Sequence, residues 1–268
     1  MSDEVTIKIT YDTGEQEFSE LDFYHGTKSL AALSEAFIIA TNAAINQEPI
    51  TKTTAAKGFR AALRKSFINS YTQTIILTFQ NATTLAAYKR LGFEGYVDFL
   101  RIAFGSAIGK DLEPQKRGSK RLIKEFEDIE WLTERIENIM HDLHSPIKYQ
   151  GLSIKLAVGA RTIETFNKQT LNYIEDEVKS KKIEEIIVGV SKFNGRTGTG
   201  RFIYEMEGES IPFYPVKQKI TQEMMTYLSR SLDKFTNGDF EQLKASVLTI
   251  HTGDGRLKRF ILHGVQPI

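Results

Sequence analysis

The sequence predicts an α+β protein: N-terminal antiparallel strands with helices and a long helix, followed by a small OB-like β-barrel. Three observations favour this class. Apolar residues alternate in some segments and recur at helical spacing in others. The composition, 41% hydrophobic and 26% charged, is that of an ordinary globular chain, and 268 residues suffice for one or two domains. Beyond residue 180 the pattern changes to short strands, so we expect domains at 1–180 and 181–268.

The N-terminal elements follow from the spacing of apolar residues. Alternation predicts strands, as from Val5 to Tyr11, whereas recurrence at three and four residues predicts helices, as in Leu30, Leu33 and Phe37. The predicted elements are, in chain order, a strand at 5–11, a helix at 22–46, strands at 58–65 and 71–79, helices at 81–91 and 96–108, a long helix at 120–143, a strand at 152–158 and a helix at 168–179.

The predicted long helix has Ser119 as its N-cap and ends before Pro146. Its apolar residues form a near-heptad seam, which needs a partner: either the helices at 81–108 or the same helix of a second copy. A charge at the centre of such a seam would dissociate a homo-oligomer. The candidate interface residues are Phe126, Ile129, Trp131, Leu132, Ile136 and Ile139, with the single tryptophan as an anchor.

The sequence of the C-terminal part predicts five strands, with one helix between the third and the fourth. The predicted strands are at 186–193, 201–206, 211–216, 247–252 and 257–263, and the helix is at 221–235. This order is that of the OB-fold, and other small barrels share it. The loops joining strands one and two and strands four and five flank the binding face of an OB-fold, and both are basic here.

Basic and aromatic residues alternate along this part, which suggests single-stranded nucleic-acid binding, because aromatic rings stack on bases and Lys or Arg contacts phosphates. The candidate nucleic-acid-binding residues are Lys192, Arg196, Arg201, Phe202, Tyr204, Arg256, Lys258 and Arg259. The charge gives weak support, since residues 181–268 carry 13 Lys+Arg against 10 Asp+Glu. A purely structural barrel with solvated charges is the alternative.

No catalytic motif assembles. The absence of Cys excludes thiol nucleophiles and Cys-ligated metals, and the Gly-rich stretch Gly195–Gly200 precedes a strand rather than the helix of a P-loop. A stripe of possible metal ligands follows the long helix: Glu130, Glu134, Glu137, His141 and His144. No second helix supplies a matching pair, so a solvated helix face is the simpler interpretation. We expect no cofactor, no metal and no catalytic residues; a cryptic hydrolase or nuclease is a further alternative.

The start of the chain has neither the basic residues nor the apolar core of a signal peptide, and no segment approaches 20 uninterrupted apolar residues. With the absence of Cys, this predicts a cytoplasmic protein without membrane contact. The net charge of +1 excludes a polyanion-binding charge spread over the whole chain, although not local patches.

The stretch Glu20-Leu21-Asp22-Phe23-Tyr24-His25-Gly26-Thr27-Lys28-Ser29-Leu30 opens the first predicted helix. It resembles the corresponding stretch of a family of uncharacterised bacterial proteins, over the first third of the chain and without a catalytic motif. Such families are often found among mobile or antiviral-defence genes, so the resemblance implies an accessory or sensor subunit of a bacterial complex. We therefore predict a non-enzymatic binding or assembly protein that acts through protein–protein contacts, with another protein or as a homo-oligomer.

Overall fold

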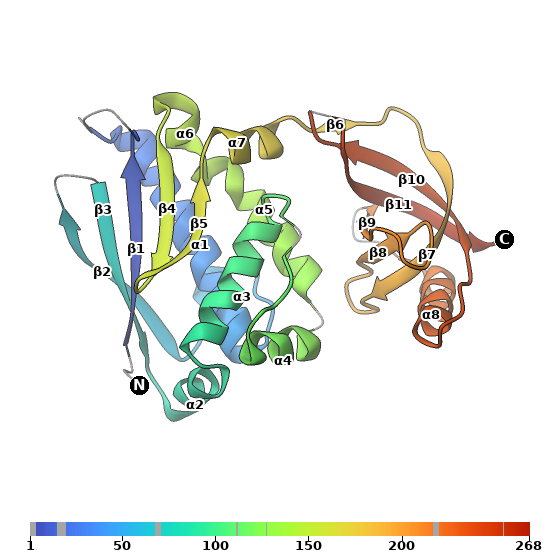
Figure 1. The fold of residues 1–268 in the computed structure, drawn as a ribbon, viewed down its shortest axis with the longest axis horizontal. Helices are drawn as coiled ribbons and strands as arrows, with labels where there is room; N and C mark the ends of the chain where they lie inside the picture. Colours follow the sequence, from blue (N-terminus) through green and yellow to red (C-terminus); the bar gives the residue numbers. More distant parts are fainter. Residues whose placement is uncertain are drawn as a thin grey trace. The chain divides into compact units, whose positions relative to one another are not determined.

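The computed structural model describes the chain except for residues 1–3, 15–19, 68–70, 111, 127, 217–219 and 254 and the side chains of 65–67. The chain divides into two compact units, Met1–Glu175 and Asp176–Ile268, and each has its own hydrophobic core. The first unit is α+β and the second contains a closed five-stranded barrel, which confirms the predicted fold class. Figure 1 shows the ribbon with its elements labelled.

The N-terminal unit is built on an antiparallel sheet in the order β2-β3-β1-β4-β5. The strands are β1 (Glu4–Asp12), β2 (Phe59–Phe67), β3 (Tyr71–Phe79), β4 (Ser153–Val158) and β5 (Arg161–Phe166). Alternation gives the sheet one buried face, on which Ile7 and Ile9 lie, and one face with Lys8 exposed to solvent. β5 was not expected from the sequence.

Helices cover the buried face. They are α1 (Phe23–Asn46), the short 3-10 helix η1 (Thr53–Ala55), α2 (Ala82–Leu91), α3 (Phe93–Ser106), α4 (Arg117–Glu125), α5 (Ile129–Leu143), α6 (Ser145–Gln150) and α7 (Lys168–Glu175). The Asn81 side chain caps α2 by accepting a hydrogen bond from Thr84 N, and the helix stops at Gly92. Among the described helices, α1 is long and apolar enough to cross a membrane, but 67% of its apolar window is buried, as expected for a core helix.

The predicted single helix at 120–143 is wrong: the structure has α4 and α5, separated at Phe126 and Asp128. Phe126 leaves the helical conformation and buries its ring edge-on to Phe99 in the core. α4 packs against α2 and α3, whereas α5 packs chiefly against α1 and also contacts α3 and α7. A single straight helix could not follow both sets of neighbours, so the seam bends where its packing partner changes.

The C-terminal unit is a barrel that closes through the order β7-β8-β9-β11-β10 and back to β7. Its elements are β6 (Val178–Lys179), β7 (Glu184–Phe193), β8 (Gly200–Ile203), β9 (Ile211–Pro215), α8 (Gln222–Thr236), β10 (Leu243–His251) and β11 (Leu257–Pro267). β9 and β11 pair in parallel and the other barrel pairs are antiparallel. With α8 between the third and fourth barrel strands, this is the predicted OB-like arrangement.

Candidate functional site

The start of α1 is attached to α6 by polar contacts. Asp22 is the N-cap of α1, and its carboxylate accepts a hydrogen bond from His25 N at 2.8 Å. The Asp22 backbone N–H donates to Gln150 Oε1 at 3.0 Å, and the Gln150 amide donates to the Glu20 carbonyl oxygen at 3.3 Å. The first turn of α1 therefore lies against α6, at a fixed position.

Three aromatic side chains, Tyr24, His25 and Tyr149, come together where these helices meet, and Phe23 directly precedes them at the start of α1. We call these four residues the aromatic cluster. The His25 ring stacks on Tyr149, with centroids 4.2 Å apart, and the Tyr24 ring meets it edge-on at 5.2 Å. Phe23, Tyr24 and Tyr149 are 86%, 66% and 61% exposed, respectively. Large aromatic residues are usually buried, so several exposed ones on two neighbouring elements indicate a contact surface.

Buried hydrogen bonds fix the start of α1, which carries most of the cluster. The Tyr11 hydroxyl donates to Ser29 Oγ at 3.0 Å, and Ser29 Oγ donates to the Leu143 carbonyl oxygen at 2.7 Å. A Cβ atom at Gly26 would lie 2.6 Å from Leu21 Cγ, so this position of the first turn needs glycine to stay in place. The supporting residues of the cluster thus join α1 to β1 and α5.

Two ion pairs border the cluster. Lys28 pairs with Asp142 at 2.9 Å and Lys148 pairs with Glu175 at 2.7 Å. The hydrogen bonds that the lysine ammonium groups donate to these carboxylates raise the pKa values of both lysines above their ordinary value. The Lys148 ammonium also lies 5.6 Å from the centre of the Tyr149 ring, within cation–π range. An apolar centre with a charged border is the usual anatomy of a protein-binding surface.

His25 Nδ1 shares a hydrogen bond with Ser145 Oγ at 2.6 Å. A serine next to an imidazole is the arrangement that activates a nucleophile. Ser145, however, is only 4% exposed, and a buried hydroxyl gives a substrate no path to it. The contact orients the His25 ring for stacking on Tyr149 and does not make a catalytic pair.

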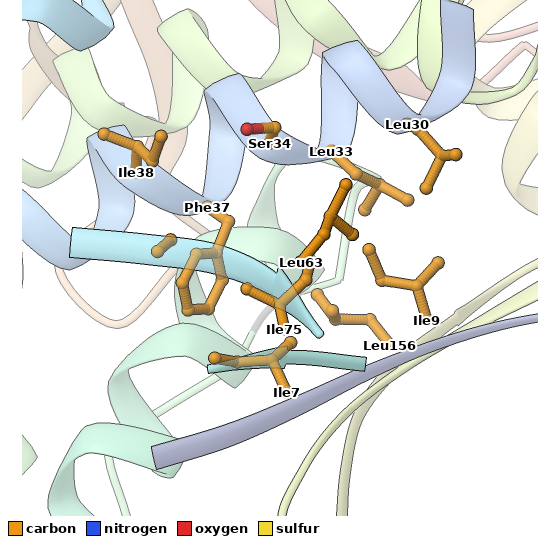
Figure 2. A pocket seen from close by; sticks show the side chains of 11 residues that line it. Ile7, Ile9, Leu30, Leu33, Ser34, Phe37, Ile38, Leu63, Ile75 and Leu156 are labelled. Atoms are coloured by element: carbon orange, nitrogen blue, oxygen red, sulfur yellow. The ribbon is translucent and has the colours of Figure 1, made fainter. Parts of the chain in front are cut away.

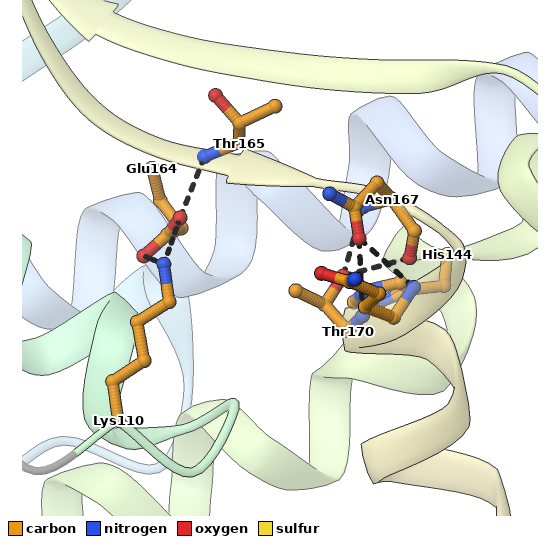
Figure 3. Close-up of polar contacts among 7 residues, drawn as sticks. Lys110, His144, Glu164, Thr165, Asn167 and Thr170 are labelled. Carbon is orange, nitrogen blue, oxygen red and sulfur yellow. Dashed lines mark hydrogen bonds and ion pairs between the residues drawn. The ribbon is translucent and has the colours of Figure 1, made fainter.

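His144 is the most deeply buried histidine and is a structural residue (Figure 3). Its Nδ1 lies 2.8 Å from the Met140 carbonyl oxygen, so it carries the proton, and its Nε2 lies 2.8 Å from Thr170 Oγ1. Burial lowers the pKa of His144 from 6.5 to about 4. The side chain is therefore neutral at physiological pH and joins α5 to α7.

A second buried polar contact in Figure 3 joins the loop after α3 to the sheet. Glu164 on β5 is 6% exposed and accepts hydrogen bonds from the Lys110 ammonium at 2.7 and 2.8 Å and from Thr165 N at 2.8 Å. The carboxylate is thus compensated, as a buried charge must be. This pair holds the edge strand β5 in place and leaves no group directed at a ligand.

The possible metal ligands on α5 do not form a site. His144 is used by Met140 and Thr170, as described above. Among the residues that the structure describes, no group of three or more His, Asp or Glu side chains could hold a metal ion.

The candidate nucleic-acid-binding residues differ in burial and in their contacts. Phe202 lies in the barrel core, stacked on Phe213 with centroids 4.0 Å apart, so its ring is not available to a base. The buried Lys258 ammonium pairs with Glu177 at 2.5 Å, and Arg259 pairs with the same carboxylate at 2.8 Å. These three side chains serve the structure of the barrel rather than an open binding face.

The remaining candidates lie closer to solvent. Arg201 is partly buried and donates to the Ser210 carbonyl oxygen at 2.5 Å and to its hydroxyl at 2.7 Å. Arg196 and Arg256 are exposed on the two loops that flank an OB-fold binding face, and Lys192 is partly buried on β7. Tyr204 is 46% exposed.

The candidate interface residues lie almost entirely inside the N-terminal unit. Phe126, Leu132 and Ile136 are at most 2% exposed and Ile129 and Ile139 at most 9%, while Trp131 is partly buried against the same core. The seam therefore packs within the chain. For α4 the partners are α2 and α3, the predicted helices at 81–108, whereas for α5 the main partner is α1, which was not predicted. The five buried side chains are not available to a second copy while the unit is folded, whereas Trp131 is partly exposed.

Comparison with protein-family models, with curated proteins and with solved structures found no match. The resemblance of residues 20–30 to a bacterial family therefore has no support beyond the sequence itself. The structure nevertheless places this stretch at the aromatic cluster.

Sequence reasoning missed the aromatic cluster because the apolar stripe of α1, extended back from Leu30, passes through Gly26 to Phe23 and suggests that Phe23 is buried. The first turn instead lies against α6. A usable signal was Phe-Tyr-His directly after the capping Asp22, since three neighbouring residues of a helix cannot all face the core.

Proposed function

We propose that this chain is a non-enzymatic binding protein that docks a protein partner through the aromatic cluster, as an accessory subunit of a larger assembly. The observation that carries the proposal is the exposure of Phe23, Tyr24 and Tyr149, each more than 60%, on the first turn of α1 and on α6, which packs against α1. Aromatic rings supply much of the energy of protein interfaces because they bury a large area with few rotatable bonds.

The size of the cluster fits this role. Three rings with these exposures present roughly 400 Å² of largely apolar surface, taking about 150–250 Å² for each aromatic side chain. A patch of this size on a monomer is often functional. The ion pairs Lys28–Asp142 and Lys148–Glu175 would lie at the border of the contact, where charges set orientation and association rate more than affinity.

The test compares the proteins that co-purify with the tagged chain, in the cells that make it, with those that co-purify with Phe23→Ala/Tyr149→Ala. Both side chains are exposed, so the double variant should fold and melt as the wild type does. We expect at least a tenfold loss of one specific partner, because truncating a hot-spot residue costs about 2 kcal/mol or more. Ile187→Ala, which removes an exposed apolar side chain from the barrel, is the control.

Sedimentation of the purified chain covers the case in which the partner is a second copy. A wild-type dimer that the double variant dissociates supports the proposal with the chain as its own partner. The proposal fails if all three proteins recover the same partners in the same amounts and sediment as the same species.

A second candidate function is single-stranded nucleic-acid binding by the barrel. It is favoured by the closed OB-like barrel and by the exposed Arg196 and Arg256 on the two flanking loops. Titration with a single-stranded oligonucleotide at two salt concentrations tests it. Binding should be steeply salt-dependent and weaker in Arg196→Ala/Arg256→Ala, whereas a flat titration at low salt would eliminate this function.

We also propose a cytoplasmic, bacterial setting, and antiviral defence as the process. The absence of Cys supports a reducing compartment. The bacterial and defence assignments rest on the resemblance of residues 20–30 alone. Disruption of the gene followed by phage challenge tests the latter, with unchanged phage sensitivity as the contrary result.

A further inference from the structure

An apolar cavity of about 210 Å³ lies between α1 and the sheet (Figure 2). Leu33, Phe37 and Ile38 line it from α1, and Leu63 and Ile75 line it from β2 and β3. The Ser34 hydroxyl is the one polar side-chain group among its lining residues. A site of this composition binds apolar groups and offers water few hydrogen-bond partners.

The cavity opens to solvent between α1 and β2. On its inner side Ile7 and Leu33 are buried, whereas Leu63 on β2 is 68% exposed and Ser34 on α1 is exposed. In Figure 2 the Leu63 side chain lies between the helix and the strands, at this opening. The hydrophobic core is therefore incomplete at this opening, and a further apolar group placed against Leu63 would fill it.

β2 is an edge strand, and its backbone beside the mouth is available for pairing. No described strand pairs with it on the side away from β3. Gln80 N donates to the Gly58 carbonyl oxygen, so Gly58 faces β3. Arg60 and Ala62 face β3 as well, because alternate residues of an antiparallel strand bond to the same neighbour.

It follows that the N–H and C=O groups of Phe59, Ala61 and Leu63 point to the free edge. Ala61 and Leu63 also line the cavity. In a strand added at this edge, residues opposite Ala61 and Leu63 would place their side chains on the same face of the sheet as the cavity. One added strand would therefore satisfy the free backbone groups and fill the cavity together.

Basic residues beside the β2 edge favour a bound segment that carries acidic residues. Arg60 and Arg64 are exposed on β2, and Lys57 is exposed just before it. The structure shows only one ion pair for these three within its described part, between Arg64 and Glu4 at 3.6 Å, with both partners exposed. An ion pair between exposed side chains contributes little to stability, so Arg64 can exchange Glu4 for a carboxylate of a bound partner.

We propose that the β2 edge and the adjoining cavity bind an extended segment of a partner protein, with apolar side chains at alternate positions and acidic residues beside them. The segment adds a sixth strand to the sheet next to β2. Its backbone supplies the hydrogen bonds, and one or two apolar side chains enter the cavity below α1. This site is separate from the aromatic cluster and stands or falls independently of it.

The experiment is a selection of 12-residue peptides displayed on phage against the full-length chain, followed by affinity measurements with the enriched peptide in synthetic form. Two variants test the geometry. Ala61→Pro removes an N–H on the free side and leaves the ladder to β3 intact, since proline is tolerated on edge strands. Ser34→Trp blocks the mouth from an exposed helix position. Ala62→Ser, whose side chain lies on the other face of β2, is the matched control.

We expect enriched peptides with alternating apolar residues and nearby Asp or Glu, bound at least tenfold more weakly by both test variants and equally by the control. Thermal melts verify that each variant is folded; if Ala61→Pro does not fold, Ser34→Trp decides alone. The proposal is overturned if no peptide is enriched above a selection on Ser34→Trp, or if the enriched peptide binds all folded variants equally. It is also overturned if decanoate binds the cavity while no peptide is selected, since the site then takes a small aliphatic ligand.

Discussion

Acid should destabilise the N-terminal unit through His144. The imidazole is fully buried and its pKa is about 4 in the folded protein, against 6.5 when exposed. As the pH falls below 6.5, the unfolded chain takes up a proton that the folded chain does not, so unfolding becomes more favourable. The stabilising effect of the neutral residue is complete above pH 6.5 and is lost as the pH approaches 4.

One pKa unit corresponds to about 1.4 kcal/mol, so His144 should lower the free energy of unfolding by about 2 kcal/mol at pH 5 and about 3 kcal/mol near pH 4. His144→Asn removes this pH-dependent contribution to the free energy of unfolding and retains an amide that can donate to the Met140 carbonyl oxygen. Its fixed cost, from lost packing, is the same at every pH and cancels when the difference between the two proteins is compared at two pH values.

Urea unfolding at pH 7.5 and 5.0, followed by fluorescence, measures this difference. Trp131 is the single tryptophan and lies in the N-terminal unit, so its emission reports on that unit alone. The destabilisation caused by His144→Asn should shrink by about 2 kcal/mol between pH 7.5 and pH 5.0. A change below about 0.5 kcal/mol would refute the buried neutral histidine. His251→Asn, in the other unit, is the control.

Two further outcomes follow from packing. Ile136→Asp places an unpaired charge at a fully buried position and should lower the free energy of unfolding by more than about 3 kcal/mol. The N-terminal unit should therefore lose its far-UV helical signal. A variant that stays folded but changes in oligomeric mass would instead support the seam as an interface between two copies. Gly118→Ala would bring a Cβ to 2.1 Å from the Leu91 carbonyl oxygen and should cost about 1–3 kcal/mol in urea unfolding, whereas Gly195→Ala, with its nearest neighbour at 3.9 Å, should be nearly neutral.

The buried carboxylate of Asp98 shows how tertiary contacts replace sequence signals. Burial raises its pKa, but hydrogen bonds from Ser119 Oγ, Lys116 N, Arg101 and Gln115 N more than reverse this, and the net pKa lies below the ordinary value. Ser119 was expected to cap a long helix. It lies within α4 and bonds to Asp98 instead, because the loop before α4 folds around that carboxylate.

Periodicity predicted β1, α1, β3 and the barrel strands because it records which face of a local element avoids water, and that information is contained in a few consecutive residues. β5 escaped notice because its buried face includes Glu164, a charge that becomes acceptable only when Lys110 reaches it from a distant loop. The ion pair and the strand depend on each other, and neither is visible in a short window of sequence.

The sequence by itself determined the α+β class, the C-terminal OB-like barrel and the lack of any cysteine chemistry. Tertiary structure alone decided that the seam breaks at Phe126, that Phe202 and Lys258 turn inward and that Phe23, Tyr24 and Tyr149 remain at the surface. The physical reason is that a residue's spacing specifies the face of its own helix or strand. Whether that face meets another element or water depends on where distant parts of the chain pack.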